Sequence, residues 1–354
     1  MIGGCGIIPG SAEYTKTKGA EQLFAATNPN MSDFIVHDHS TDGVDRRGFL
    51  KCMAWAGTGV LWSLNGGILT SRAFGETPDV GGAVVEASKA TLNFVQISDS
   101  HIGFKRPGVN EDVTATLAEA VRRINASPVQ PEFLLHTGDL SHLAEADEFD
   151  TLDQALKDLR AKQVFYVPGE HDILNDNGAE YRARFGKGTL GSGWYSFDQK
   201  GVHFIALVNV AGVSEGGLGV LGADQLEWLA KDVESLSADT PLVVFAHVPL
   251  WMVYPKWGWG TDDGAKALAL VKRFGSVTCL NGHIHQVVQK VEGNITFHTA
   301  RSTAFPQPVA GTAPKPGPMK VEAPRLQSLL GLTSVSYVES HPTLAVVDST
   351  LSEG

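Results

Sequence analysis

Five hydrophobic segments of this chain each end at, or within three residues before, an aspartate, a glutamate or a histidine. Short apolar runs of this kind are typical of strands in a buried sheet. Ligand sites in open α/β sheets lie just beyond the carboxyl ends of the strands. We therefore expect the five strand ends to meet at one pocket that holds three carboxylates and several imidazoles. These strands are expected at 92–97, 133–136, 164–167, 242–246 and 277–280.

Apolar residues at helical spacing lie between the expected strands, so the chain alternates strand and helix and should adopt an α/β layered fold. A further strand is expected at 202–208 and a short helix at 265–274. Residues 305–324 are rich in Pro and Gly and should form a long irregular loop or lid. The helical stripes are Val113, Leu117, Val121 and Ile124; Phe149, Leu152, Leu156 and Leu159; and Leu226, Leu229 and Val233.

The charge balance argues against a nucleic-acid polymer as a partner. The chain has 28 Lys and Arg against 39 Asp and Glu, a net charge of −11, whereas phosphate backbones need a basic surface. The three cysteines, Cys5, Cys52 and Cys279, are too few and too scattered for a disulfide framework or a cysteine-built zinc site. The twelve histidines, several of them beside aspartates, are the better candidates for chemistry.

The first 75 residues do not share the strand–helix pattern. Residues 1–44 show no sustained apolar period. They are expected to be a disordered N-terminal extension, or one that results from a wrongly assigned start codon. Residues 45–75 resemble a twin-arginine export signal: Arg46 and Arg47 precede Phe-Leu-Lys, a weakly apolar run and a small-x-small cleavage pattern ending at Ala73. A membrane anchor or a buried helix is the alternative, disfavoured by Gly and polar interruptions. The resemblance implies the twin-arginine machinery as a partner, a periplasmic or secreted protein, and no stable membrane anchor.

Taken together, the strand-end motifs resemble those of the calcineurin-like metallophosphoesterase superfamily, and most closely its bacterial cyclic-nucleotide-phosphodiesterase-like branch. The motifs are Asp-x-His, Gly-Asp, Gly-Glu-His-Asp, a lone His and Gly-His-x-His, in that order along the chain. The resemblance implies a domain at 90–350 with a four-layer αββα sandwich, in which helices flank two mixed sheets and a dinuclear metal site lies at the carboxyl ends of the strands.

The resemblance also implies a role for each motif residue. One metal would be held by Asp99, His101 and His285, and a second by Glu170, His247 and His283, with Asp139 bridging the two. His171 would be the general acid, and Asp172 would orient it. Two metals that share a carboxylate can clamp a phosphoryl group and generate a hydroxide that attacks phosphorus.

Glu170 departs from the family pattern, in which a neutral Asn stands at this position. Three carboxylates and a bridging hydroxide carry −4 and would leave two divalent metals neutral, whereas one trivalent ion restores a charge of +1. The sequence therefore favours iron with iron, manganese or zinc, or else a weakened phosphate hydrolysis. The alternative is that Glu170 points away or acts only by supporting the ligands.

For several other side chains the sequence leaves more than one role open. His142 could touch substrate or cap a helix, and Arg301 is a candidate phosphate clamp. An aromatic loop could stack on a planar group, although packing over the core is the more ordinary role. Cys279 should be an unreactive residue of the core. His298 follows the last site motif closely along the chain. The aromatic residues of the loop are Trp251, Tyr254, Trp257 and Trp259.

The leading hypothesis is an exported dinuclear-metal hydrolase of a small-molecule phosphomonoester or phosphodiester. The alternative is a non-hydrolytic periplasmic metal-binding or redox scaffold, in which Glu170 has replaced the neutral ligand at the cost of hydrolysis.

Overall fold

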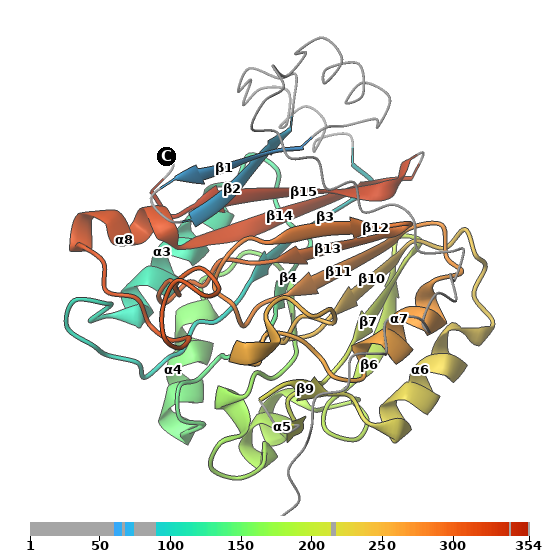
Figure 1. The fold of residues 1–354 in the computed structure, drawn as a ribbon, viewed down its shortest axis with the longest axis horizontal. Helices are drawn as coiled ribbons and strands as arrows, with labels where there is room; N and C mark the ends of the chain where they lie inside the picture. Colours follow the sequence, from blue (N-terminus) through green and yellow to red (C-terminus); the bar gives the residue numbers. More distant parts are fainter. Residues whose placement is uncertain (1–59, 66–67, 74–89, 214–216, 340, 353–354) are drawn as a thin grey trace, which may run out of the picture. The chain divides into compact units, whose positions relative to one another are not determined.

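The computed structural model describes residues 60–65, 68–73, 90–213, 217–339 and 341–352 (Figure 1). The expected extension 1–44 and the paired Arg46 and Arg47 lie outside the described residues. Within the expected export segment 45–75, the two described stretches are strands, β1 (Val60–Asn65) and β2 (Ile68–Ala73), which pair antiparallel. Among the described residues, no helix is long and apolar enough to cross a membrane.

The first large sheet has five strands in the order β15-β14-β3-β4-β5. The three strands that precede site motifs run parallel, and the two C-terminal strands are antiparallel to their neighbours. The bounds are β3 (Leu92–Ile97), β4 (Phe133–His136), β5 (Gln163–Tyr166), β14 (Gly331–Val338) and β15 (His341–Thr350).

The second large sheet has six strands in the order β12-β13-β11-β10-β7-β6. The four inner strands run parallel, and an antiparallel strand closes each edge. The bounds are β6 (Tyr195–Gln199), β7 (Val202–Ala206), β10 (Leu242–Phe245), β11 (Val277–Asn281), β12 (Gln289–Glu292) and β13 (Ile295–Thr299); a separate short pair is β8 (Gly212–Val213) with β9 (Gly219–Val220).

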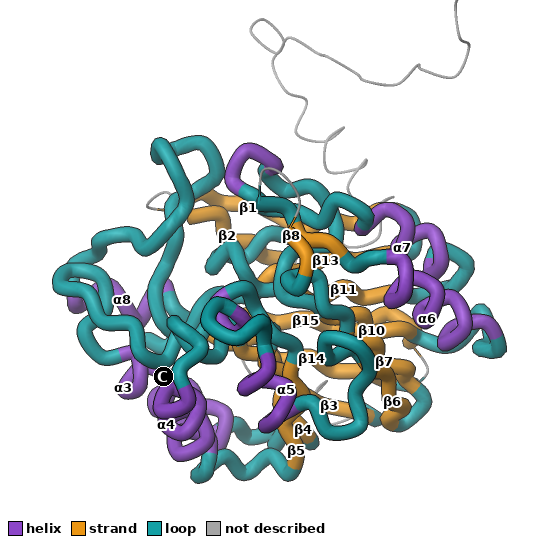
Figure 2. The backbone as a smooth tube through the Cα atoms, turned by 90° about the horizontal axis from the view of Figure 1, so that it is seen from below, coloured by secondary structure: helices purple, strands orange, loops and turns teal. Residues whose placement is uncertain are grey.

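The two sheets pack face to face, and helices cover their outer faces. Along β3, Leu92 and Phe94 contact the second sheet, while Val95 and Ile97 pack toward α3 and α4. This alternation is the period of two that a strand buried on both faces requires. Figure 2 shows the strands between α3 and α4 on one side and α6 and α7 on the other. The order of layers is thus helix, sheet, sheet, helix.

The helices begin where the sequence supplies caps. Asp112 accepts a hydrogen bond from the Ala115 N–H at the start of α3, and Glu145 with Glu148 forms a capping box at the start of α4. The helix bounds are α3 (Val113–Ala126), α4 (Ala146–Leu156), α5 (Ala179–Phe185), α6 (Ala223–Glu234), α7 (Gly264–Val271) and α8 (Ala323–Leu329), with 3₁₀ turns η1 (His171–Ile173) and η2 (Pro255–Trp257).

The expected strands and helices are present with small shifts at their ends, and the αββα class with two mixed sheets is confirmed. Among the described residues, nine strands were not expected: β6, β12, β13, β14 and β15 of the two large sheets, and the short pairs β1 with β2 and β8 with β9. The Pro-rich segment expected as a loop at 305–324 is irregular up to 322, and α8 then begins at Ala323.

Candidate metal centre

The predicted metal ligands follow five strands that belong to both sheets. Asp99, His101, Asp139 and Glu170 follow β3, β4 and β5 of the five-stranded sheet, whereas His247, His283 and His285 follow β10 and β11 of the other. The loops are joined at the backbone, because the Asp99 N–H donates to Gly138 O at 3.0 Å and the Gly282 N–H donates to His247 O at 3.0 Å. All seven predicted ligands therefore lie at one end of the sandwich.

Five of the seven ligands have a left-handed backbone, which non-glycine residues rarely adopt. Such conformations cost free energy and persist where the surrounding structure holds them. Here they turn the chain sharply at the strand ends, so that side chains two positions apart, such as Asp99 and His101, reach one centre. The residues are Asp99 (φ 55°), His101 (φ 42°), Asp139 (φ 51°), His283 (φ 69°) and His285 (φ 54°).

A first group of ligands consists of Asp99, His101 and His285, whose ligand atoms lie within 4.8 Å of one another. The His285 Nε2 atom is 3.2 Å from Asp99 Oδ1 and 3.3 Å from His101 Nε2. All three side chains are buried. The His285 Nδ1–H donates to Phe305 O at 2.6 Å, which leaves Nε2 as the ligand atom.

A second group consists of Glu170, His247 and His283. The two Glu170 oxygens divide between the histidines: Oε2 lies 2.9 Å from His247 Nε2, and Oε1 lies 2.9 Å from His283 Nδ1. The His247 Nδ1–H donates to Thr137 O at 2.7 Å and so directs Nε2 to the group. The alternative in which the Glu170 side chain points away is therefore wrong.

Asp139 lies between the two groups. Its Oδ2 atom is 3.5 Å from His101 Nε2 in the first group and 3.4 Å from His247 Nε2 in the second. Its Oδ1 atom accepts a hydrogen bond from the His171 N–H at 2.9 Å. One carboxylate that reaches both groups is the arrangement needed to share a ligand between two metal ions.

The donor set fits a pair of metal ions. Several buried atoms here make no hydrogen bond although they lie close to other ligand atoms, namely Glu170 Oε2, His247 Nε2 and both ring nitrogens of His283. Unpartnered buried polar atoms are costly, and a cation among them would supply the missing partner. Carboxylate oxygens and imidazole nitrogens suit zinc, manganese or iron.

Without metal, protons compensate part of the negative charge. Burial alone would raise the pKa of Asp99, but His285 and His247 lower it to about 2. Burial alone would lower the pKa of His247, but Asp139 and Glu170 raise it well above its usual range. A proton on His247 must leave before Nε2 can bind a metal, so metal binding at this centre should release protons.

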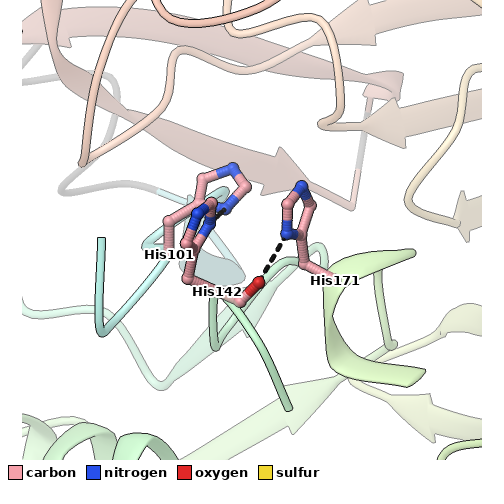
Figure 3. Close-up of side chains that lie close together, drawn as sticks. All are labelled: His101, His142 and His171. Atoms are coloured by element: carbon pink, nitrogen blue, oxygen red, sulfur yellow. Dashed lines mark hydrogen bonds between the residues drawn. The ribbon is translucent and has the colours of Figure 1, made fainter. Parts of the chain in front are cut away.

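His171 and His142 lie beside the first group (Figure 3). The His171 Nδ1–H donates to His142 O at 2.6 Å, so the Nε2 atom remains for a substrate. The two rings stack with centroids 4.7 Å apart, and His142 Nδ1 is 3.4 Å from His101 Nδ1. Burial opposes protonation of His171, but Asp139 and Glu170 raise its pKa above the usual value. His142 does not cap a helix; it lines the cleft.

Asp172 does not orient the His171 ring, because its carboxylate is occupied elsewhere. It accepts hydrogen bonds from the N–H groups of Leu140, Ser141 and Gly169 at 3.1, 2.8 and 2.8 Å, and from Ser141 Oγ at 2.8 Å. The orienting partner of His171 is the main-chain oxygen of His142. Asp172 instead ties the loop after β4 to the loop after β5, and the orienting contact with His171 that the sequence led us to expect is not formed.

Glycines let the loops approach the ligands. A Cβ atom on Gly169 would collide with the Asp139 carboxylate, one on Gly138 with the His247 ring, and one on Gly282 with Ser98 and Asp99. The glycines of the motifs are therefore required by close packing against the ligands rather than by the turns alone.

The ligands open into a cleft of about 150 Å³, which the Pro-rich segment covers on one side. Phe305 packs on the His101 ring at 4.7 Å, and Gln307 Nε2 donates to His283 O at 2.9 Å. Arg106 also lines this cleft and was not expected from the sequence, because no motif marks it. The lining residues are His101, Phe104, Arg106, Asp139, His142, Glu170, His171, His283, His285, Phe305, Gln307, Gly317 and Pro318.

Other candidates lie outside the cleft. Arg301 donates to Ser328 O at 3.3 Å, and His298 pairs with Asp348 at 3.0 Å. Trp251 packs on Phe297 in the core, and the aromatic loop supplies no residue to the cleft lining, which supports the packing role. Cys279 is fully buried within β11, in the core cluster between the second sheet and its helices.

Replacing Gly169 by Ala should displace Asp139, because the added methyl group meets its carboxylate. We expect metal affinity to fall by about 10- to 100-fold, as when a group that orients a ligand is lost. Competition with a chromogenic chelator measures this affinity. The matched control is Gly275→Ala, whose Cβ would meet only Ala238 O at 3.7 Å; equal affinities in the two variants would contradict the prediction.

Comparison with known proteins gives a family and a fold. The calcineurin-like phosphoesterase family matches residues 92–287. A 3′,5′-cyclic-nucleotide phosphodiesterase of Nostoc sp. is 25% identical over 231 residues, 61% of this chain and 80% of the relative. A probable glycerophosphodiester phosphodiesterase of Arcobacter nitrofigilis is 24% identical over 227 residues, 59% and 77% of the two chains.

Two solved structures share the fold. A dimetal phosphatase of Danio rerio matches with a TM-score of 0.55 and 14% identity, covering 74% of this chain and 99% of that one. A purple acid phosphatase of yellow lupin matches with a TM-score of 0.54 and 12% identity, covering 74% and 52%. The family match spans more than half of the chain and contains all seven predicted ligands. The chain therefore belongs to the calcineurin-like phosphoesterase family and is a metal-dependent phosphoesterase.

Proposed function

We propose that this protein hydrolyses a small-molecule phosphoester, with phosphodiesters as the preferred class, and that it acts after export from the cytoplasm. The observation that carries the proposal is the placement of Asp139 between two ligand groups on the floor of a cleft that His171 also lines. The names of the bacterial relatives support a diester substrate.

The ligands of both groups would hold two metal ions. Such a pair supplies Lewis-acid stabilisation of phosphoryl oxygens and a nucleophile at neutral pH. The chain itself supplies a proton: His171 Nε2 faces the cleft, and the bond from Nδ1 to His142 O fixes the ring. Asp139 and Glu170 favour the protonated form, which suits a group that donates to a leaving oxygen.

Replacing His171 by Ala should lower kcat by about 10²- to 10⁴-fold, the usual contribution of a general acid. Metal content should stay at the wild-type level, because the residue belongs to neither ligand group. Hydrolysis of bis(p-nitrophenyl) phosphate and elemental analysis of the same preparation measure both quantities. His203→Ala removes a histidine that pairs with Asp198 and Asp232 away from the cleft, and serves as the control. An unchanged kcat in the His171 variant would refute the role.

We also propose that one of the two metals is trivalent iron, with iron, manganese or zinc as its neighbour. Glu170 adds a third carboxylate to the centre and lowers its charge by one relative to a neutral ligand. One trivalent ion restores that charge and, with it, the attraction for an anionic ester.

Glu170→Asn should therefore shift the bound metals from iron toward zinc or manganese. Elemental analysis after aerobic and anaerobic purification measures the ratio in wild type and variant. Two zinc or two manganese ions in a fully active wild-type protein would contradict the iron proposal. Tight metal binding without turnover of any mono- or diester would instead favour a non-hydrolytic metal-binding scaffold. This is the second candidate function, because Glu170 adds a carboxylate to the centre.

Export through the twin-arginine pathway is supported by the arginine pair and the apolar run that follows it. Cell fractionation of a bacterial host that makes the full chain should give a shortened protein in the periplasm. Arg46→Lys with Arg47→Lys should retain the full-length chain in the cytoplasm, and Lys51→Arg should not. Export that is unaffected by the double change would refute this route.

A further inference from the structure

A second cleft adjoins the cleft of the metal centre. Its volume is about 390 Å³, and it shares Arg106, Gly317 and Pro318 with the inner cleft. A molecule whose phosphate lies at the metal ligands can therefore extend past Arg106 into the outer cleft. The remaining lining residues are Pro308, Ala313, Lys315, Pro316 and Met319.

The charges of the outer cleft have one sign. Arg106 and Lys315 are its only charged lining residues, although acidic residues outnumber basic ones in the chain as a whole. Within the described ranges, neither cation forms an ion pair with a carboxylate. The Arg106 guanidinium lies 5.6 Å from the centroid of Phe104, a ring of the inner cleft. These cations thus remain available to an anion from solution.

The wall that carries Lys315 is tied to the metal centre. The Gly317 N–H donates to Gln307 Oε1 at 2.9 Å, and Gln307 Nε2 donates to the main-chain oxygen of the ligand His283. Further along, the Met319 N–H donates to Pro306 O at 2.9 Å and the Val321 N–H to Gly108 O at 3.1 Å. The segment is held on both sides of Lys315.

We propose that the outer cleft binds a second anionic group of the substrate through Arg106 and Lys315. The preferred substrate is then a phosphoester of which one arm carries a further phosphate or carboxylate, separated from the scissile phosphate by a linker that packs on Pro308 and Met319. This inference rests on the proposed function and specifies its substrate class. A cyclic mononucleotide has no second anionic group, so it would leave the outer cleft unused.

The kinetic test uses two matched substrates, the p-nitrophenyl ester of thymidine 5′-phosphate and the same ester with an additional 3′-phosphate. We expect kcat/KM to be about tenfold higher for the second, the effect of one charge-assisted contact at an accessible site. Lys315→Gln and Arg106→Gln should each reduce that ratio, and the double variant should bring it to about 1. Lys105→Gln and Lys320→Gln, which remove exposed cations outside both clefts, should keep the wild-type ratio.

A binding test separates this inference from the hydrolase proposal. Calorimetry on the metal-loaded protein compares hydrolysis-resistant alkylphosphonates with α,ω-bisphosphonates and ω-carboxyalkylphosphonates of matched length. Tighter binding of the doubly anionic compounds that is lost in Lys315→Gln supports the inference even if no ester is turned over. The last two series distinguish a phosphate from a carboxylate as the second group. Turnover of esters with equal affinities throughout the series would overturn the outer-cleft inference and leave the hydrolase proposal standing.

Discussion

The structure depends on the mutual neutralisation of three carboxylates and four imidazoles at the ends of the strands. Asp99 is fully buried, Asp139 almost fully, and Glu170 partly. Carboxylates so close together are stable only with positive charge among them. Protons on imidazoles such as His247 supply part of that charge in the metal-free protein, and two cations would supply it otherwise. Metal binding and proton release are thus linked.

The backbone around this centre is specialised for bringing the ligands together. Left-handed conformations at Asp99, Asp139 and His283 turn the chain into the centre directly after the strands. Asp172 joins the loop after β5 to the loop after β4 through three hydrogen bonds, from Leu140 and Ser141, and glycine at 169 makes room for Asp139. Local strain at the ligands is therefore held by a network of buried contacts around them.

The sequence predicted much of this arrangement because hydrophobic runs that end in Asp or His mark strand ends directly. It did not predict β14 and β15, because Ser and Thr residues such as Thr333, Ser334 and Ser336 interrupt the apolar pattern. The turn between β6 and β7 was also missed, since Lys200 adopts a left-handed conformation that Asn or Gly usually supplies.

The sequence could not assign Asp172 or Arg106 correctly, because both depend on long-range packing. Asp172 follows His171 in the chain, yet its carboxylate bonds to the loop 30 or so residues earlier. Arg106 belongs to no motif and lines the cleft next to Phe104, whose ring packs at 4.4 Å on Phe305 of a distant segment.

The ligands come from both halves of the sandwich, and this has a mechanical consequence. Asp99, which follows a strand of one sheet, accepts a hydrogen bond at 3.1 Å from the His283 N–H, which follows a strand of the other. The centre therefore connects the two sheets at one end of their interface. A small slide of one sheet over the other would change the separation of the two ligand groups. Substitutions in the core between the sheets, far from any substrate, should therefore lower the rate of hydrolysis before they unfold the protein.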